Sequence, residues 1–123
     1  MKSSFRKTWA EVDLNALEHN VNVLYEYHQK ELIAVIKANA YGHGDVMIAR
    51  HLEQMGIRMC AVATLDEAIN LRNHEIHMDI LCMGYVEAED LEFAHVHDII
   101  VTMVSLNWVV KAPRVDGLRV HVK

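Results

Sequence analysis

The spacing of hydrophobic residues changes between two patterns along the first part of the chain. Intervals of three and four residues predict an amphipathic helix over residues 14–28. Its apolar stripe consists of Leu14, Leu17, Val21, Leu24 and His28. A short strand is predicted before it, at 9–12. Residues 32–36 then form a continuous apolar run that is too short for a helix and is typical of a strand buried on both faces.

The alternation of helix and strand continues to the end of the chain. A helix is predicted over 45–55, with Gly56 as its C-terminal cap, and the capping-box pattern from Thr64 to Glu67 starts a helix that runs to about residue 73. The other predicted helices are 87–96 and a short one from Ser105 to residue 110, which Pro113 ends. The remaining predicted strands are 59–63, 79–83, 99–103 and 118–122.

This order of elements predicts the α/β class, with a parallel sheet and helical crossovers. Such a chain has two ways to arrange its sheet: a doubly wound open sheet, or a barrel that needs eight repeats and about 250 residues. The chain has 123 residues, and no linker or domain boundary interrupts it. Five barrel-type strands would not close an eight-stranded barrel.

Composition narrows the classes of function. A formal net charge of −5 without a basic stripe argues against a protein that binds nucleic acid. The first residues carry positive charge but no continuous apolar stretch, so neither a signal peptide nor a membrane span is expected, and a cytoplasmic location is the default. Cys60 and Cys82 lie in apolar runs without metal or redox spacing, which favours reduced thiols in the core.

The nine histidines do not form a metal-binding pattern. The two closest groups, His74 with His77 and His95 with His97, lie at predicted element ends without a third ligand placed nearby. We therefore expect these side chains to be solvated or bonded locally, and no metal site. His43, inside a glycine-containing loop, is expected to have a structural role.

Lys37 is the candidate reactive group. It follows the predicted strand 32–36, and ligands of parallel α/β folds bind at the carboxyl ends of the strands. A lysine partly withdrawn from water more readily presents a free amine, which can attack carbonyl groups. Its residue types alone also fit a lysine that extends to solvent at a strand end, followed by a tight turn.

A family resemblance favours the chemical interpretation. The segment AVIKANAYGHG at 34–44 resembles the pyridoxal-phosphate lysine motif of the alanine racemases. Four further segments resemble the same family in the same order: TWAEVDLNALEHNV at 8–21, AVATLDEAINLR at 61–72, ILCMGY at 80–85 and VHVK at 120–123. The resemblance implies that residues 1–123 are the N-terminal portion of a TIM-type (β/α)8 barrel domain, roughly its first five strands, without the C-terminal β-domain.

The resemblance also assigns residues to the cofactor. Lys37 matches the lysine that forms the internal aldimine with pyridoxal 5'-phosphate and acts as the base for one enantiomer. Tyr41 matches a tyrosine near the cofactor phosphate, and Val35 and Met83 match apolar positions around the pyridine ring. Lys123 matches a lysine that is carbamylated in some members.

The implied activity is the interconversion of L-alanine and D-alanine, which supplies D-alanine for bacterial peptidoglycan. The family is homodimeric, and the second base is a tyrosine from the C-terminal domain of a partner subunit, so these 123 residues are expected to be inactive alone. The alternatives are a pyridoxal-phosphate-binding module without racemization, a serine or broad-specificity racemase, or an interaction fragment that self-associates through open strand edges.

Overall fold

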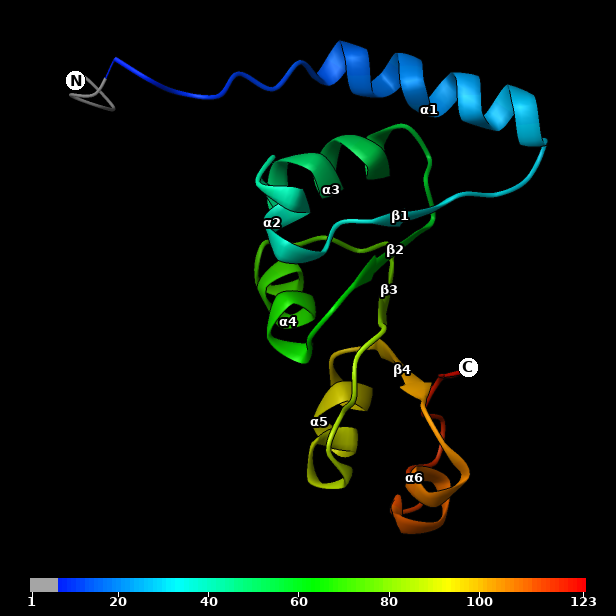
Figure 1. Ribbon diagram of the computed structural model, residues 1–123. Coiled ribbons are helices and arrows are strands. Elements are labelled where there is room, and N and C mark those ends of the chain that lie inside the picture. The colour runs from blue at the N-terminus through cyan, green and yellow to red at the C-terminus, as the bar shows by residue number, and fades with distance from the viewer. Residues whose placement is uncertain (1–6) are drawn as a thin grey trace.

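The computed structural model describes residues 7–123 and contains a parallel sheet with helices between its strands (Figure 1). The helices are α1 (Leu14–His28), α2 (Lys37–Tyr41), α3 (Asp45–Gln54), α4 (Leu65–Asn73), the 3-10 turn η1 (Ala88–Asp90), α5 (Leu91–Val96) and α6 (Leu106–Lys111). The strands are β1 (Ile33–Val35), β2 (Met59–Val62), β3 (Asp79–Cys82), β4 (Ile99–Met103) and β5 (Val120–Val122).

The strands lie in the sheet in their order along the chain, β1-β2-β3-β4-β5, and every neighbouring pair is parallel. A doubly wound sheet reverses this order at a switch point and carries helices on both faces. Here the order does not reverse, and α3, α4 and α5 lie along one side of the strands (Figure 1). The sheet is therefore wound like the first part of a (β/α)8 barrel, which confirms the predicted fold class.

The two faces of the sheet have different surroundings. Alternate strand residues, such as Cys60 and Ile80, pack with buried residues of the helices in one continuous core. The opposite face carries a small separate cluster of Ala61, Leu81 and Ile100, to which no helix of residues 7–123 contributes. We call this second surface the inner face, because it corresponds to the interior side of a barrel.

The start of the chain differs from the prediction. Residues 9–12 form no strand, and Trp9 is 68% exposed. Strand β1 was expected to be buried on both faces, yet Ile33 is 50% and Val35 42% exposed. The reason is tertiary: β1 is an edge of this sheet, and nothing in the described part of the chain covers its inner face. Residues 1–6 lie outside the described residues. They belong to the N-terminal segment for which neither a signal peptide nor a membrane span was expected.

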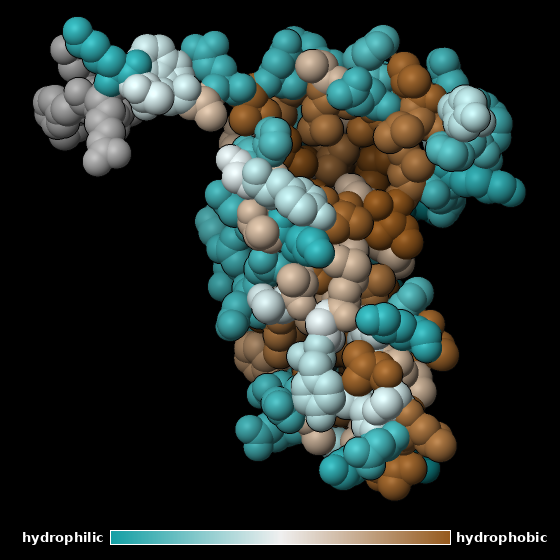
Figure 2. Space-filling model, in the orientation of Figure 1, coloured by the Kyte–Doolittle hydropathy of each residue, from teal (hydrophilic) through white to brown (hydrophobic). Residues whose placement is uncertain are grey.

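Helix α1 is held more loosely than the other long helices. Its boundaries confirm the prediction, and the Asp13 side chain caps it by accepting from the N–H groups of Asn15 and Ala16. None of its residues is buried, although Leu14, Leu17 and Val21 contact the core. An apolar hollow of about 460 Å³ remains between α1, β1 and α3 and is visible in Figure 2.

The central elements follow the sequence prediction closely. The Thr64–Glu67 capping box is formed, α3 is followed by Gly56 at φ +88°, and β2, β3 and β4 begin at the predicted residues. The predicted helix 87–96 is divided into η1 and α5. Cys60 and Cys82 are free and buried, as expected of core thiols.

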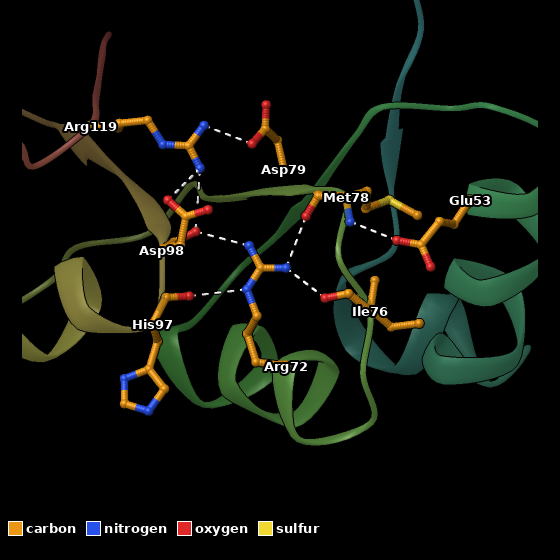
Figure 3. A network of polar contacts seen from close by, with 8 residues as sticks. All are labelled: Glu53, Arg72, Ile76, Met78, Asp79, His97, Asp98 and Arg119. Carbon is orange, nitrogen blue, oxygen red and sulfur yellow. Dashed lines mark hydrogen bonds and ion pairs between the residues drawn. The ribbon is translucent and has the colours of Figure 1, made fainter.

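A guanidinium group joins the chain segments that enter β3 and β4, at the amino-terminal edge of the sheet (Figure 3). Arg72 of α4 donates to the carbonyls of Ile76 at 2.6 Å, Met78 at 2.9 Å, His97 at 3.0 Å and Asp98 at 2.9 Å. These carbonyls lie in loops, and without Arg72 each would lose a charged hydrogen-bond donor. The arrangement stabilises the edge opposite to that of Lys37.

Candidate functional site

Lys37 lies at the carboxyl end of β1 and is half-buried. The preceding residue, Ile36, is 3% exposed and continues the parallel ladder, because its N–H donates to the carbonyl of Ala61 at 2.9 Å. The side chain before Lys37 therefore anchors the backbone in the core. Lys37 itself is the first residue free of that ladder, at the edge where parallel α/β proteins place their reactive groups.

After Lys37, the element labelled α2 is a left-handed turn and not an ordinary α-helix. Ala38, Asn39, Ala40 and Tyr41 have φ values between +50° and +55°, followed by Gly42 at +87°. An L-residue in this conformation costs roughly 1–2 kcal/mol, and consecutive examples are rare because each side chain crowds a carbonyl. Four in a row require surrounding structure that holds them in place, and backbone strain of this kind concentrates at functional sites.

Hydrogen bonds around the turn supply that restraint. The N–H of Ala38 donates to Glu67 Oε1 at 2.7 Å, and the N–H of Asp45 donates to Asn39 Oδ1 at 3.0 Å. Ala40 is buried, and its carbonyl lies 2.9 Å from His43 Nδ1 and accepts from the His43 N–H at 3.1 Å. His43 therefore bonds the backbone of the turn, in agreement with the structural role expected for it.

The next two strands end close to this turn. Glu67 Oε2 accepts from the N–H of Ala63 at 2.7 Å and of Thr64 at 3.3 Å, directly after β2. The carbonyl of Ala63 accepts from the N–H of Gly84 at 3.1 Å, directly after β3. A Cβ on Gly84 would lie 2.2 Å from that carbonyl oxygen, so this close approach requires glycine. The carboxyl ends of β1, β2 and β3 are thus tied together.

An apolar surface lies next to Lys37 on the inner face. Val35 pairs with Ala61, and Ala61 pairs with Leu81, so the three side chains form a row across β1, β2 and β3. Met83, two residues beyond Leu81, is partly buried and packs against the inner-face cluster. Val35 and Met83, from two segments far apart in the sequence, therefore lie on the same face of the sheet, and Lys37 follows β1 at the carboxyl edge of that sheet.

The other two residues implied by the family resemblance are farther from the core. Tyr41 ends the left-handed turn and is 62% exposed. Lys123 follows β5 and is exposed, and its N–H lies 3.4 Å from the carbonyl of Met103. Lys123 shares the carboxyl edge with Lys37, but four strand spacings separate them, roughly 19 Å along the sheet.

Neither the histidines nor the cysteines form a second reactive centre in the described part of the chain. Residues 7–123 contain no group of three or more His, Cys, Asp or Glu side chains able to hold a metal ion. His74 Nδ1 and His97 Nδ1 lie 2.8 Å and 2.9 Å from the carbonyls of Asn70 and Phe93, as expected of locally bonded histidines. Burial raises the pKa of Cys60 to about 12 and raises that of Cys82, which keeps both thiols protonated and poorly nucleophilic.

Sequence reasoning did not identify two residues of this site. Glu67 was predicted only as a helix cap, because its bond to Ala38 spans 29 positions in the sequence. Asn39 was not singled out, although asparagine tolerates the left-handed region better than most residues. A local signal existed for Asn39 in its residue type, whereas the contact of Glu67 with Ala38 had none.

Comparisons with known proteins agree with this geometry. Residues 12–123 match the family described as "Alanine racemase, N-terminal domain". The alanine racemase of Halalkalibacterium halodurans is 43% identical over 130 residues, which cover 100% of this chain and 34% of that protein. The crystal structure of alanine racemase from Oenococcus oeni has a TM-score of 0.87 and 33% identity, and the alignment covers 98% of this chain and 32% of that one.

A histidine racemase from Leuconostoc mesenteroides is also similar, with a TM-score of 0.74 and 26% identity over 79% of this chain and 26% of that one. The chain spans about a third of the length of the curated relatives it matches. The family match covers both the left-handed turn that carries Lys37 and the five parallel strands. This chain belongs to the alanine racemase family, and its residues 12–123 match the N-terminal domain of that family.

Proposed function

We propose that this chain carries the cofactor-binding lysine of a pyridoxal-phosphate-dependent alanine racemase. The observation that supports the proposal best is the place of Lys37, at the carboxyl end of β1 before a restrained left-handed turn. Family membership supports the reaction, since the relatives named above are alanine racemases. Because the chain matches only a third of those relatives, the activity is assigned to a protein of which it forms the N-terminal part.

The residues around Lys37 fit the chemistry of pyridoxal phosphate. The cofactor needs a primary amine for its aldehyde and an apolar surface for its ring, and the row of Val35, Ala61 and Leu81 offers such a surface. Beyond the lysine, a Cβ added to Gly42 would meet nothing within 4 Å, so the turn leaves open space beside it. Met83 would extend the apolar contact, and Tyr41, which is exposed, would donate its hydroxyl to a phosphate oxygen.

Each part has a distinct task in the proposed reaction. When bound, pyridoxal phosphate stabilises the negative charge that develops at the substrate Cα. Lys37 Nζ removes or returns the Cα proton on one face, and the strand end and the turn hold that amine in place. Racemization needs a second base on the opposite face, which we assign to a partner subunit of a homodimer. The 123-residue chain alone is therefore expected to lack turnover, and we place the reaction in the cytoplasm.

Trapping the cofactor on the protein tests this proposal. The chain is incubated with pyridoxal phosphate, reduced with borohydride and digested, and the labelled peptide is mapped. We expect the label on Lys37, its loss in Lys37→Ala, and wild-type labelling in Lys30→Ala, which removes an exposed lysine outside the site. Labelling spread evenly over exposed lysines would contradict the cofactor site. Racemization by the isolated chain, abolished in Lys37→Ala, would contradict the need for a second subunit.

Two alternatives, a broader substrate range and self-association, have specific support, and a third is separated from them by experiment. The similar histidine racemase from Leuconostoc mesenteroides favours testing amino acids besides alanine, including serine, with the whole protein. A cofactor-binding module without racemization would take the label at Lys37, yet the whole protein would turn over none of these amino acids. Self-association is supported by the exposed β1 edge and the uncovered inner face, and size-exclusion chromatography of the chain tests it.

A further inference from the structure

The Glu67 carboxylate binds backbone groups from two neighbouring strand ends at once. Its Oε1 atom accepts from the N–H of Ala38 at 2.7 Å. Its Oε2 atom accepts from the N–H of Ala63 at 2.7 Å and, more weakly, from that of Thr64 at 3.3 Å. Glu67 is held in turn by α4, where its own N–H donates to Thr64 Oγ1 at 3.2 Å. One half-buried carboxylate therefore spans the gap between β1 and β2.

The bond to Ala38 acts on Lys37 through the peptide that joins them. The Ala38 N–H belongs to that peptide, so an acceptor that fixes its direction restrains ψ of Lys37 and φ of Ala38, which is +52°. This is the point at which the chain leaves the strand and enters the left-handed turn. A hydrogen bond to a charged acceptor is of the same order in free energy as the strain of one left-handed residue, so this contact can offset that strain.

We propose that Glu67 is a positioning residue for Lys37: its Oε1 atom fixes the Lys37–Ala38 peptide, and through it the direction in which the lysine amine is presented on the inner face. The proposal deepens the proposed function and rests on it, because that function has Lys37 bind pyridoxal phosphate. Glu67 itself is assigned no proton transfer. Its role is to hold the amine where the apolar row of Val35, Ala61 and Leu81 lies beside it.

Helix capping is the competing explanation for Glu67, and the two oxygens separate the two roles. Capping uses Oε2 and the Thr64 hydroxyl, whereas positioning uses Oε1. Glutamine is an accepted residue at this position of a capping box. In Glu67→Gln the one remaining oxygen is expected at the Oε2 position, where it accepts from two N–H groups, so the NH₂ group faces the single Ala38 N–H. Thr64→Val removes the hydroxyl cap and leaves both Glu67 oxygens in place.

Amide hydrogen exchange of the three proteins tests the contact without any cofactor. We expect the Ala38 amide to exchange at least tenfold faster in Glu67→Gln than in the wild type, while Ala63 keeps its protection. In Thr64→Val the Ala38 amide should exchange at the wild-type rate. Equal acceleration at Ala38 in both variants, or none in Glu67→Gln, would overturn the proposal, because the first means capping alone and the second means that Ala38 does not depend on Oε1.

The second arm uses pyridoxal phosphate as the probe. Circular dichroism of the bound chromophore reports whether its orientation is fixed, and borohydride labelling reports attachment. We expect Glu67→Gln to reduce both the dichroic band and the rate of Lys37 labelling by about tenfold, and Thr64→Val to leave both unchanged. Equal behaviour of the two variants would overturn the positioning role.

Failure of the proposed function has a different signature. If the wild-type chain does not take up pyridoxal phosphate at Lys37, the cofactor assignment fails, and with it the purpose we give to the positioning. Labelling of the wild type together with unchanged labelling and dichroism in Glu67→Gln overturns only the role of Glu67. The two results are distinguished by the wild-type sample.

Discussion

The Arg72 guanidinium donates a 2.9 Å hydrogen bond to the carbonyl of Asp98, across 26 positions of the sequence, and thereby joins α4 to the entrance of β4 (Figure 3). Three further carbonyls accept from the same side chain, and burial lowers its pKa. A cation withdrawn from water is stabilised here by four directed acceptors. This contact belongs to the edge of the sheet opposite to Lys37, so it is expected to affect folding and not the cofactor site.

Arg72→Met should destabilise the protein by about 3 kcal/mol, because the methionine fills similar space but leaves buried carbonyls without a donor. Urea unfolding monitored by far-ultraviolet circular dichroism measures the loss. Arg50→Met is the matched control, since Arg50 is exposed and donates to one carbonyl, that of His74, and its loss should cost below about 1 kcal/mol. Equal costs in the two variants would contradict the role of Arg72.

Alkaline pH should destabilise the fold through Cys60. Below pH 9 its thiol is protonated in both the folded and unfolded states, so it contributes no pH dependence. Above pH 9 the unfolded thiol ionises while the folded one keeps its proton up to a pKa of about 12, so stability falls across this window. The loss from this group at pH 10 should be on the order of 1 kcal/mol.

Urea midpoints at pH 8 and pH 10 measure that loss in the wild type and in Cys60→Ala. The variant has a lower stability at pH 8, because it leaves a small cavity, but between the two pH values it should lose less stability than the wild type, by an amount on the order of 1 kcal/mol. The difference isolates the contribution of Cys60 from that of every other group common to the two proteins, including Cys82. An identical pH dependence in both proteins would mean that the buried thiol is not the source.

Gly84→Ala should separate the ends of β2 and β3. The added Cβ would meet the Ala63 carbonyl oxygen at 2.2 Å, and a backbone atom has no rotamer with which to move away. We expect a loss of more than about 2 kcal/mol and faster amide exchange at Gly84's neighbours.

Gly56→Ala provides the comparison for Gly84. Its φ is +88°, but an added Cβ would meet nothing within 4 Å, so only backbone strain of about 1 kcal/mol is expected. Thermal unfolding of both variants decides the point. A smaller loss for Gly84→Ala than for Gly56→Ala would show that the strand ends can separate at little cost.

Asn39→Ala should weaken the left-handed turn in two ways. It removes the side-chain acceptor of the Asp45 N–H, and it replaces a residue that tolerates positive φ with one that does not. We expect a loss of about 1–2 kcal/mol in urea unfolding.

Asn39→Gly tests which of these effects dominates. Glycine accepts the φ of +55° without strain but provides no acceptor, so it should recover part of the loss. A glycine variant less stable than the alanine variant would assign the whole effect to the side-chain bond.

Information within short segments of the sequence determined most of the element pattern. The capping box at Thr64–Glu67, the three-and-four spacing of α1 and the apolar runs of β2 to β4 each lie within a few residues, and each corresponds to an element of the structure. The position of Lys37 at the end of β1 was predictable for the same reason, whereas its proposed chemical role came from the family resemblance. A strand at 9–12 was wrongly predicted, because a short apolar segment forms a strand only if a neighbour pairs with it.

Tertiary structure alone decided the rest. Strand order and the side on which the helices pack separate a barrel winding from a doubly wound sheet, and both depend on which distant segments meet. Burial of Ile33 and Val35 depended on whether a neighbour covers β1, which their own apolar character does not specify. The contact of Glu67 with Ala38 arises because two strand ends lie side by side. Local sequence sets backbone preference and periodicity, whereas packing between remote segments sets position.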